Sequence, residues 1–129
     1  MADILSIVWK QETIGEGWDA SPDPVIWIAT AALDAEWRNS SDYISAGGIG
    51  SLHAGRYEHF GKFFPAAEFI YMPTISFDEQ GIIVFTDGRH RFAWLRDHGL
   101  RSLPIQVEEE QADLFESRFG TRDRAGVIL

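Results

Sequence analysis

The sequence contains no cysteine. Disulfides, thiolate nucleophiles and cysteine-ligated zinc are therefore excluded, and we expect a cytoplasmic protein. No apolar run is long enough to span a bilayer. The apolar residues 4–9 are interrupted by Ser6 and follow no basic region. We therefore expect neither an export signal nor contact with a membrane.

Basic residues are scarce, with 11 Lys and Arg against 20 Asp and Glu, which gives a formal net charge of -9. A uniformly acidic surface is repelled by nucleic acid. The charge is uneven, however. Residues 1–86 have a balance of -8 and residues 108–129 a balance of -3, whereas residues 87–107 have a balance of +2. The segment around Arg89 is therefore where we expect an anion to bind.

The chain has 129 residues, 45% of them hydrophobic, and five are tryptophan. This composition fits one domain, residues 1–129, with a core that needs no cross-links. The patterns mix strands and helices, which indicates an α+β or α/β protein, and we assign a small α+β domain with a mixed sheet. Strands are expected at residues 4–9, 25–28, 69–77, 82–85 and 103–107. Helices are expected at residues 30–37, 56–64, 87–98 and 109–119.

Several residues are expected to mark the boundaries of these elements. Thr30 and Asp87 are typical helix N-caps, and Gly99 is typical of the position just after a helix. Pro73 is expected to bend the strand at 69–77 or to confine it to an edge. Residues 15–24 and 39–55 read as loops, and the second is long enough to be a functional loop.

The segment from Asp87 to Arg91 carries the chemistry that we consider most informative. A buried strand ends at residue 85, and Gly88 permits a close approach of the backbone. Arg89, His90 and Arg91 then occupy the first turn of a helix. Cations at a helix N-terminus are unfavourable by about 0.3–1 kcal/mol each. They become favourable when free N–H groups and guanidinium groups converge on an anion. The alternative is that the arginines point to solvent or pair with the many carboxylates of the chain.

The string VFTDGRHRFAWLRDHGLRSLPIQV, residues 84–107, resembles the characteristic segment of the ParB/sulfiredoxin superfamily. Within that superfamily, the group that it resembles most is the plasmid fertility inhibition factors, for which an upstream helix such as RYEHFGKFF, residues 56–64, is expected. The resemblance covers roughly residues 56–107. It implies a ParB/sulfiredoxin-like fold and phosphate contacts from Gly88, Arg89, His90 and Arg91.

The departures from the superfamily pattern limit the activity that the resemblance implies. Sulfiredoxins have a catalytic cysteine where Arg89 stands here, so sulfinic acid reduction is excluded. ParB partition proteins have a glutamate at that position, and the reversed charge argues against CTP hydrolysis. No DNA-reading helix-turn-helix domain follows residue 107, which argues against a partition role.

The resemblance favours a regulatory protein that lowers conjugative transfer by acting on the transfer machinery or on single-stranded DNA. Its expected ligand is a nucleotide, ATP or CTP, or another phosphate. The first alternative is a weak ATPase or nuclease. In it His90 is the general acid or base, and Asp87 orients His90 or holds Mg²⁺. The second alternative is an acidic immunity or antitoxin protein that covers a basic partner. Whether the protein is an enzyme stays open.

Other candidate sites receive less support from the sequence. His53, Glu58 and His59 lack the spacing that places two histidines on adjacent helical turns, so we expect no metal site there. The acidic run 108–110 reads as a solvated helix start rather than a magnesium site. Trp94 is expected to pack in the core rather than to flank a base. Ser40 and Ser41 have no adjacent base, and no nucleophile-elbow motif is present.

Overall fold

The structure is a computed structural model, and it describes residues 6–12 and 22–129. Most of the expected loop at 15–24 lies outside the described residues, as does the start of the expected strand at 4–9. Within the described part of the chain, no helix has the length and apolar character needed to cross a membrane.

Within the described residues, the larger of two sheets has four strands in the order β2-β6-β4-β5. They are β2 (Val25–Ala29), β6 (Ser102–Gln106), β4 (Thr74–Phe77) and β5 (Ile83–Asp87). The β2–β6 and β4–β5 pairs are antiparallel, whereas β6 and β4 are parallel. The sheet is therefore mixed, which confirms the α+β class. The β4–β5 pair is the hairpin expected around residues 79–81, and the Gly81 N–H donates to the carbonyl of Asp78.

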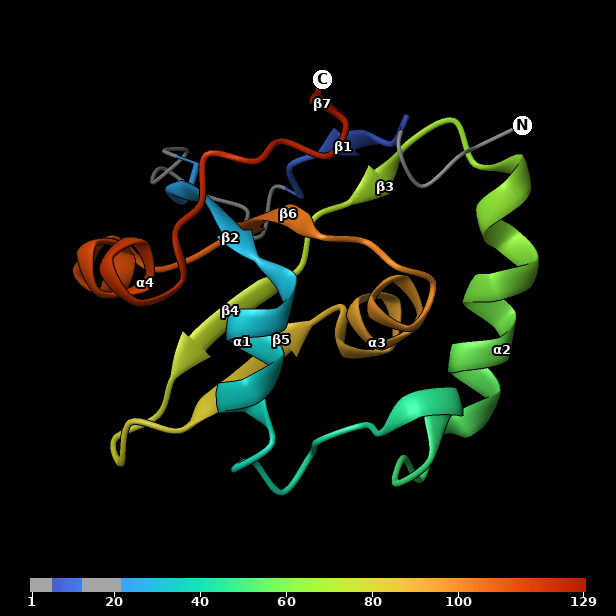
Figure 1. Cartoon of the computed structure of the whole chain (residues 1–129), viewed down its shortest axis with the longest axis horizontal. Helices are drawn as coiled ribbons and strands as arrows, with labels where there is room; N and C mark the ends of the chain where they lie inside the picture. Colours follow the sequence, from blue (N-terminus) through green and yellow to red (C-terminus); the bar gives the residue numbers. More distant parts are fainter. Residues whose placement is uncertain (1–5, 13–21) are drawn as a thin grey trace.

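A smaller sheet has three parallel strands in the order β3-β1-β7 (Figure 1). They are β1 (Val8–Lys10), β3 (Ile70–Tyr71) and β7 (Val127–Ile128). The single strand expected at 69–77 is thus divided into β3 and β4, which belong to different sheets. Pro73 lies between them, and it has no N–H to donate to a continuous ladder. Its carbonyl accepts from the Gln106 N–H at 2.9 Å.

The helices lie close to their expected positions. They are α1 (Thr30–Trp37), α2 (Ala54–Phe63), α3 (Arg89–Asp97) and α4 (Ala112–Phe119). Single 3-10 turns are η1 (Ala46–Gly48), η2 (Phe64–Ala66) and η3 (Glu109–Gln111). The expected N-cap at Thr30 is wrong, because Ala29 precedes the helix and Thr30 is buried in its first turn. Helix α1 directly follows β2, so the extended residue at the junction is the last of that strand.

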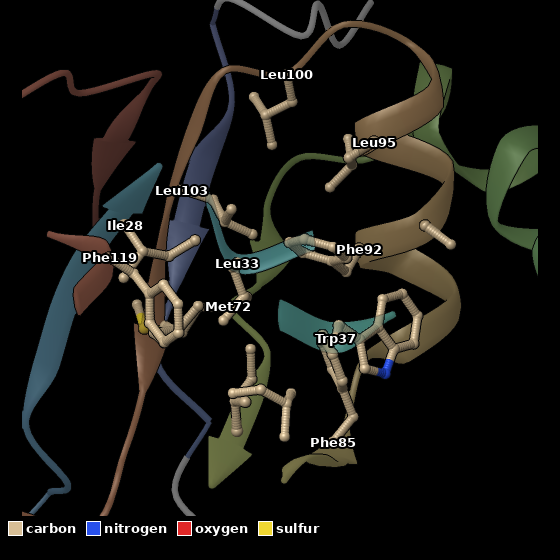
Figure 2. Packing of buried hydrophobic residues seen from close by; sticks show 14 of the residues in the cluster. Ile28, Leu33, Trp37, Met72, Phe85, Phe92, Leu95, Leu100, Leu103 and Phe119 are labelled. Atoms are coloured by element: carbon tan, nitrogen blue, oxygen red, sulfur yellow. The ribbon is translucent and has the colours of Figure 1, made fainter. Parts of the chain in front are cut away.

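Much of the hydrophobic core lies between the larger sheet and helices α1 and α3, and the same cluster extends to Phe119 of α4 (Figure 2). Trp37 is fully buried, and its ring centroid lies 4.6 Å from that of Phe85 on β5 and 5.6 Å from that of Phe92 on α3. Aromatic pairs at these distances add to the stabilisation from apolar burial. These contacts hold the end of β5 and the start of α3 together.

Helix α2 lies beside α3 at one side of the molecule, with α3 between it and the larger sheet (Figure 1). Phe60 and Phe64 of α2 pack on Trp94 of α3, with ring centroids 5.5 and 5.2 Å away. Gly61 allows this approach, since a Cβ there would lie 2.5 Å from the Trp94 indole nitrogen. The position of α2 therefore depends on its contact with α3.

Candidate functional site

The junction between β5 and α3 is a one-residue turn at Gly88. Its φ is +90°, in the left-handed region that favours glycine. A Cβ at this position would lie 3.1 Å from the Cα of Pro73 and 2.8 Å from the Arg91 Nη2. The helix begins here, because the Phe92 N–H donates to the Gly88 carbonyl at 2.9 Å. The backbone N–H groups of the first turn are therefore directed out of the N-terminal end of α3.

Asp87 does not cap this helix, and the expectation that it does is wrong. It is the last residue of β5, and the N-cap residue of α3 is Gly88, which has no side chain to form a capping hydrogen bond. Its carboxylate instead accepts a hydrogen bond from Arg91 Nη2 at 2.8 Å. Burial would raise the pKa of Asp87, but the hydrogen bond and charge of Arg91 outweigh it and hold the pKa below its usual value. The guanidinium of Arg91 is thus already paired with the Asp87 carboxylate.

Glu12 adds a second carboxyl group beside Asp87. Its backbone is fixed by Gln106, which accepts from the Glu12 N–H at 2.7 Å and donates to the Glu12 carbonyl at 3.0 Å. The hydrogen bond to Asp87 is the largest cause that raises the pKa of Glu12, followed by burial and the negative charge of Asp87. Ionisation of Glu12 is therefore less favourable beside Asp87 than it is in water.

His90 is buried in the first turn of α3, and only 8% of its surface is exposed. Its Nε2 lies 2.8 Å from the Oγ of Ser51. Burial, with the positive charges of Arg89, Arg56 and His53, lowers the pKa of His90 to about 4. The imidazole is therefore neutral at pH 7. The structure pairs His90 with Ser51 and Asp87 with Arg91, so Asp87 is not the residue that orients His90.

A cleft of about 640 Å³ opens in front of this junction, between α2 and the turn. Five of its lining side chains are guanidinium or imidazole groups: Arg56, His59, Arg89, His90 and Arg91. Five are aromatic: Phe60, Phe63, Phe69, Tyr71 and Phe85. Asp87 and Gly88 also line it. All five residues that the sequence analysis singled out, 87–91, therefore meet at one cavity.

Arg56 and His59 line the cleft although nothing in the local sequence points to them as part of the anion site. Both are exposed on α2, and they lie on the helix face that also presents Phe60 and Phe63 to the cleft. The spacing of three and four residues between them is the signal that could have indicated a shared face. Ser51 was also missed, because nothing in the sequence pairs it with a histidine 39 residues later.

The remaining sequence candidates lie elsewhere. Trp94 packs against α2, and its ring stacks on His98 at 3.6 Å between centroids. It does not appear among the residues that line the cleft. Among residues 6–12 and 22–129, no group of three or more His, Asp or Glu side chains is placed to hold a metal ion.

Fold and site together define a class: a small α+β domain with mixed sheets and a basic, aromatic-lined cleft at a strand–turn–helix junction. The family described as plasmid fertility inhibition factor matches residues 25–120. The chain belongs to this family.

One solved structure resembles the fold: the crystal structure of oncogenic suppression activity protein, a plasmid fertility inhibition factor, in a gold(I) cyanide derivative. The TM-score is 0.58 and the sequence identity is 17%. The match covers 75% of this chain and 56% of that one, so this chain corresponds to little more than half of the solved protein. No curated protein matches the sequence.

Proposed function

We propose that this protein is a regulator that lowers conjugative DNA transfer and that its cleft binds the phosphate groups of a nucleotide or a single DNA strand. Family membership supports the process, and the cleft supports the ligand. The observation that supports this ligand is that Arg56 and Arg89 line the same cleft as the N-terminal end of α3. We further propose that the fold is of the ParB/sulfiredoxin type, since Gly88 supplies the turn between a buried strand and a basic helix start.

The cationic side chains that line the cleft come from two helices. Arg91 is paired with Asp87, so Arg89 on α3 and Arg56 on α2 are the arginines expected to bind a phosphate directly. The dipole and N–H groups of α3 favour the same ligand. Neutral His90 is expected to contribute a hydrogen bond rather than a charge.

The aromatic side chains that line the cleft fit a nucleobase. Phe63 is 48% exposed and Tyr71 36% exposed, although both are large apolar or aromatic side chains. Phe69 contacts Tyr71 edge-on, with centroids 5.2 Å apart, and Lys10 lies over the Phe69 ring. Stacking of a base on such a ring contributes roughly 1–3 kcal/mol and depends little on which base it is.

Calorimetry with ATP, CTP and a single-stranded oligonucleotide tests the ligand. Arg89→Ala should weaken binding by roughly tenfold or more, which corresponds to one lost charge-assisted contact. Arg56→Ala should have a similar effect. Arg101→Ala is the matched control, because Arg101 is exposed and does not line the cleft. Absence of binding to all three ligands, or equal losses in Arg101→Ala and Arg89→Ala, would refute the phosphate site.

Phe63→Ala distinguishes base stacking from phosphate binding in the cleft. It should weaken binding of ATP but leave binding of inorganic triphosphate unchanged, because the triphosphate has no base to stack. Equal effects on both ligands would place the base elsewhere.

A mating assay tests the process. The protein is expressed in donor cells that carry a mobilisable plasmid, and transconjugants are counted. We expect transfer to fall with the native protein and to recover with the folded Arg89→Ala variant. Unchanged transfer across several unrelated plasmids would refute fertility inhibition. Full inhibition by the variant would assign the effect to the acidic surface of residues 1–86 instead.

A hydrolytic activity is the second candidate, and the neutral, buried His90 beside the cleft favours it. Hydrolysis of a phosphoanhydride or phosphodiester should be slow and lost on chelation, because no dedicated carboxylate cluster is present in the sequence. Asp87→Asn should lower the rate if Asp87 holds Mg²⁺. Undiminished hydrolysis in that variant would exclude this role of Asp87.

A further inference from the structure

The loop of residues 45–53 is attached to α3 by hydrogen bonds to two side chains, which lie about two helical turns apart. Near the end of the helix, the Gly47 N–H donates to the Asp97 carboxylate at 3.0 Å. In the first turn, the Oγ of Ser51 lies 2.8 Å from the Nε2 of His90. The loop therefore holds the Ser51 hydroxyl in a defined position beside the His90 ring.

His90 separates Ser51 from the cleft. His90 lines the cleft, whereas Ser51 is not among the described residues that line it. One ring nitrogen, Nε2, is directed to the Ser51 hydroxyl. Within the described residues, the other nitrogen, Nδ1, has no hydrogen-bond partner, and it is not one of the polar atoms that the protein encloses without a partner. Nδ1 is therefore the nitrogen that can contact a ligand.

The hydrogen bond at Nε2 decides which of the two nitrogens carries the ring hydrogen. A neutral imidazole has a single N–H, and the partner of one nitrogen sets the tautomer. The Ser51 Oγ already accepts a hydrogen bond from the His53 N–H at 3.0 Å. Within the described residues, the acceptor that remains for the Ser51 hydroxyl is Nε2 of His90. Because the hydroxyl donates to Nε2, the ring hydrogen lies on Nδ1.

We propose that Ser51 is a positioning residue: its hydroxyl fixes the tautomer of His90, and the Nδ1–H of the neutral ring donates to a phosphate oxygen bound in the cleft. This inference rests on the proposed phosphate site, and it names one donor of that site and the residue that orients it. The opposite tautomer would turn a lone pair of Nδ1 toward the anion. Ser51 needs no access to the ligand, because it acts through the His90 ring.

The charges around His90 explain why its tautomer matters. Burial, with the positive charges of Arg89, Arg56 and His53, lowers the pKa of His90 to about 4. An imidazolium ion would donate from both nitrogens whatever its neighbours, but a neutral ring donates from one nitrogen only. At pH 7 the ring can therefore contact a phosphate as a donor only if its hydrogen is on Nδ1. The two arginines then supply the charge that attracts the phosphate, and His90 adds a directional hydrogen bond.

Nuclear magnetic resonance of the ligand-free protein tests the tautomer. With histidine labelled with nitrogen-15, correlations between the ring protons and the ring nitrogens distinguish a nitrogen that carries hydrogen from one that carries a lone pair. At pH 7, Nδ1 of His90 should carry the hydrogen. Ser51→Ala should give a mixture of both tautomers, and Ser51→Thr, which keeps the hydroxyl, should restore the native one. Ser45→Ala is the matched control in the same loop and should not change the tautomer.

Two substitutions of His90 test which nitrogen donates to the ligand. His90→Asn keeps an amide N–H near the position of Nδ1, whereas His90→Gln places its amide near the position of Nε2. Calorimetry at pH 7 with ATP, CTP and a single-stranded oligonucleotide should show affinity within about threefold of native for His90→Asn and a loss of about tenfold for His90→Gln. Ser51→Ala should weaken binding by roughly threefold to tenfold, and Ser51→Thr should restore it.

Hydrogen on Nε2 in the native protein, or a native tautomer in Ser51→Ala, would overturn the proposal. Tighter binding by His90→Gln than by His90→Asn would do the same. Circular dichroism and the melting temperature establish that each variant is folded, and the spectrum of the native protein needs no variant. The two proposals fail in different ways. Binding of any of the three ligands with no change at the Nδ1 resonance overturns the donor role alone, whereas absence of binding to all three overturns the phosphate site and this inference with it.

Discussion

Acidification should destabilise this protein through His90. The buried imidazole has a pKa of about 4, held down first by burial and then by the positive charges of Arg89 and Arg56. In the unfolded chain the same group has a pKa of about 6.5. Between these two values the unfolded state binds a proton that the folded state does not. The free energy of unfolding therefore falls as pH decreases from 6.5 towards 4.

The magnitude follows from the separation of the two pKa values. Each unit corresponds to about 1.4 kcal/mol, so the full effect is on the order of 3 kcal/mol. Above pH 6.5 both states are neutral at His90, and this contribution is constant. Below pH 4 both states are protonated, and the loss is complete. Since many domains are stable by only about 5–15 kcal/mol, a change of this size is readily measured.

Urea denaturation at a series of pH values between 4 and 8 measures the effect. Other groups also titrate in this range, so the comparison is between the native protein and His90→Gln. The variant should be less stable at pH 7.5, and its deficit should shrink by on the order of 3 kcal/mol at pH 4. A deficit that stays constant with pH would refute the buried, neutral state of His90.

Three further substitutions test the packing of α2 and the ion pairing of α3. Gly61→Ala should destabilise the protein by about 1–2 kcal/mol, because its Cβ would lie 2.5 Å from the Trp94 ring nitrogen. Gly55→Ala, in open space on the same helix, should stabilise the protein by up to about 1 kcal/mol. Urea denaturation of both variants tests whether the two changes in stability have opposite signs. Arg96→Met should cost about 3 kcal/mol, since Asp34, 10% exposed, would lose the guanidinium 2.9 Å away; a midpoint equal to the native one would show that the pair contributes nothing.

The elements that the sequence predicts well are those with local signals. Helix α3 is an example at its C-terminal end. Gly99, with φ of +89°, donates to the carbonyl of Arg96, and the N–H of Leu100 donates to that of Leu95. This is the hydrogen-bond pattern expected when glycine follows a helix, and it depends only on neighbouring residues. The hairpin of β4 and β5 is confirmed for a similar reason, because a tight turn joins two apolar runs.

The errors arise where a neighbouring side chain takes the partner that a local signal predicts, or where distant parts of the chain decide the local structure. Aspartate is a residue type typical of N-caps, but the Asp87 carboxylate accepts a hydrogen bond from Arg91, one turn later. Gly88 supplies the turn into the helix. The division of residues 69–77 between two sheets depends on strands β1 and β6, which lie far away in the sequence. No pattern within the segment specifies those partners.

The candidate site shows the same division. The basic turn 87–91 was recognised because its residues are consecutive and depart from the charge preference of a helix start. Arg56, Ser51 and Glu12 come from three other parts of the chain, and only the fold brings them beside that turn.

The number of cationic side chains that can contact a ligand determines which helices must be held together at the site. Arg91 is paired with Asp87, and His90 is neutral, so α3 alone offers Arg89 and the end of its dipole. Among the described residues that line the cleft, the guanidinium besides Arg89 and the Asp87-paired Arg91 is that of Arg56, on α2. The packing of α2 on α3 at Gly61 therefore sets the distance between Arg56 and Arg89. A side chain at position 61 should weaken phosphate binding as well as stability, although it touches no ligand.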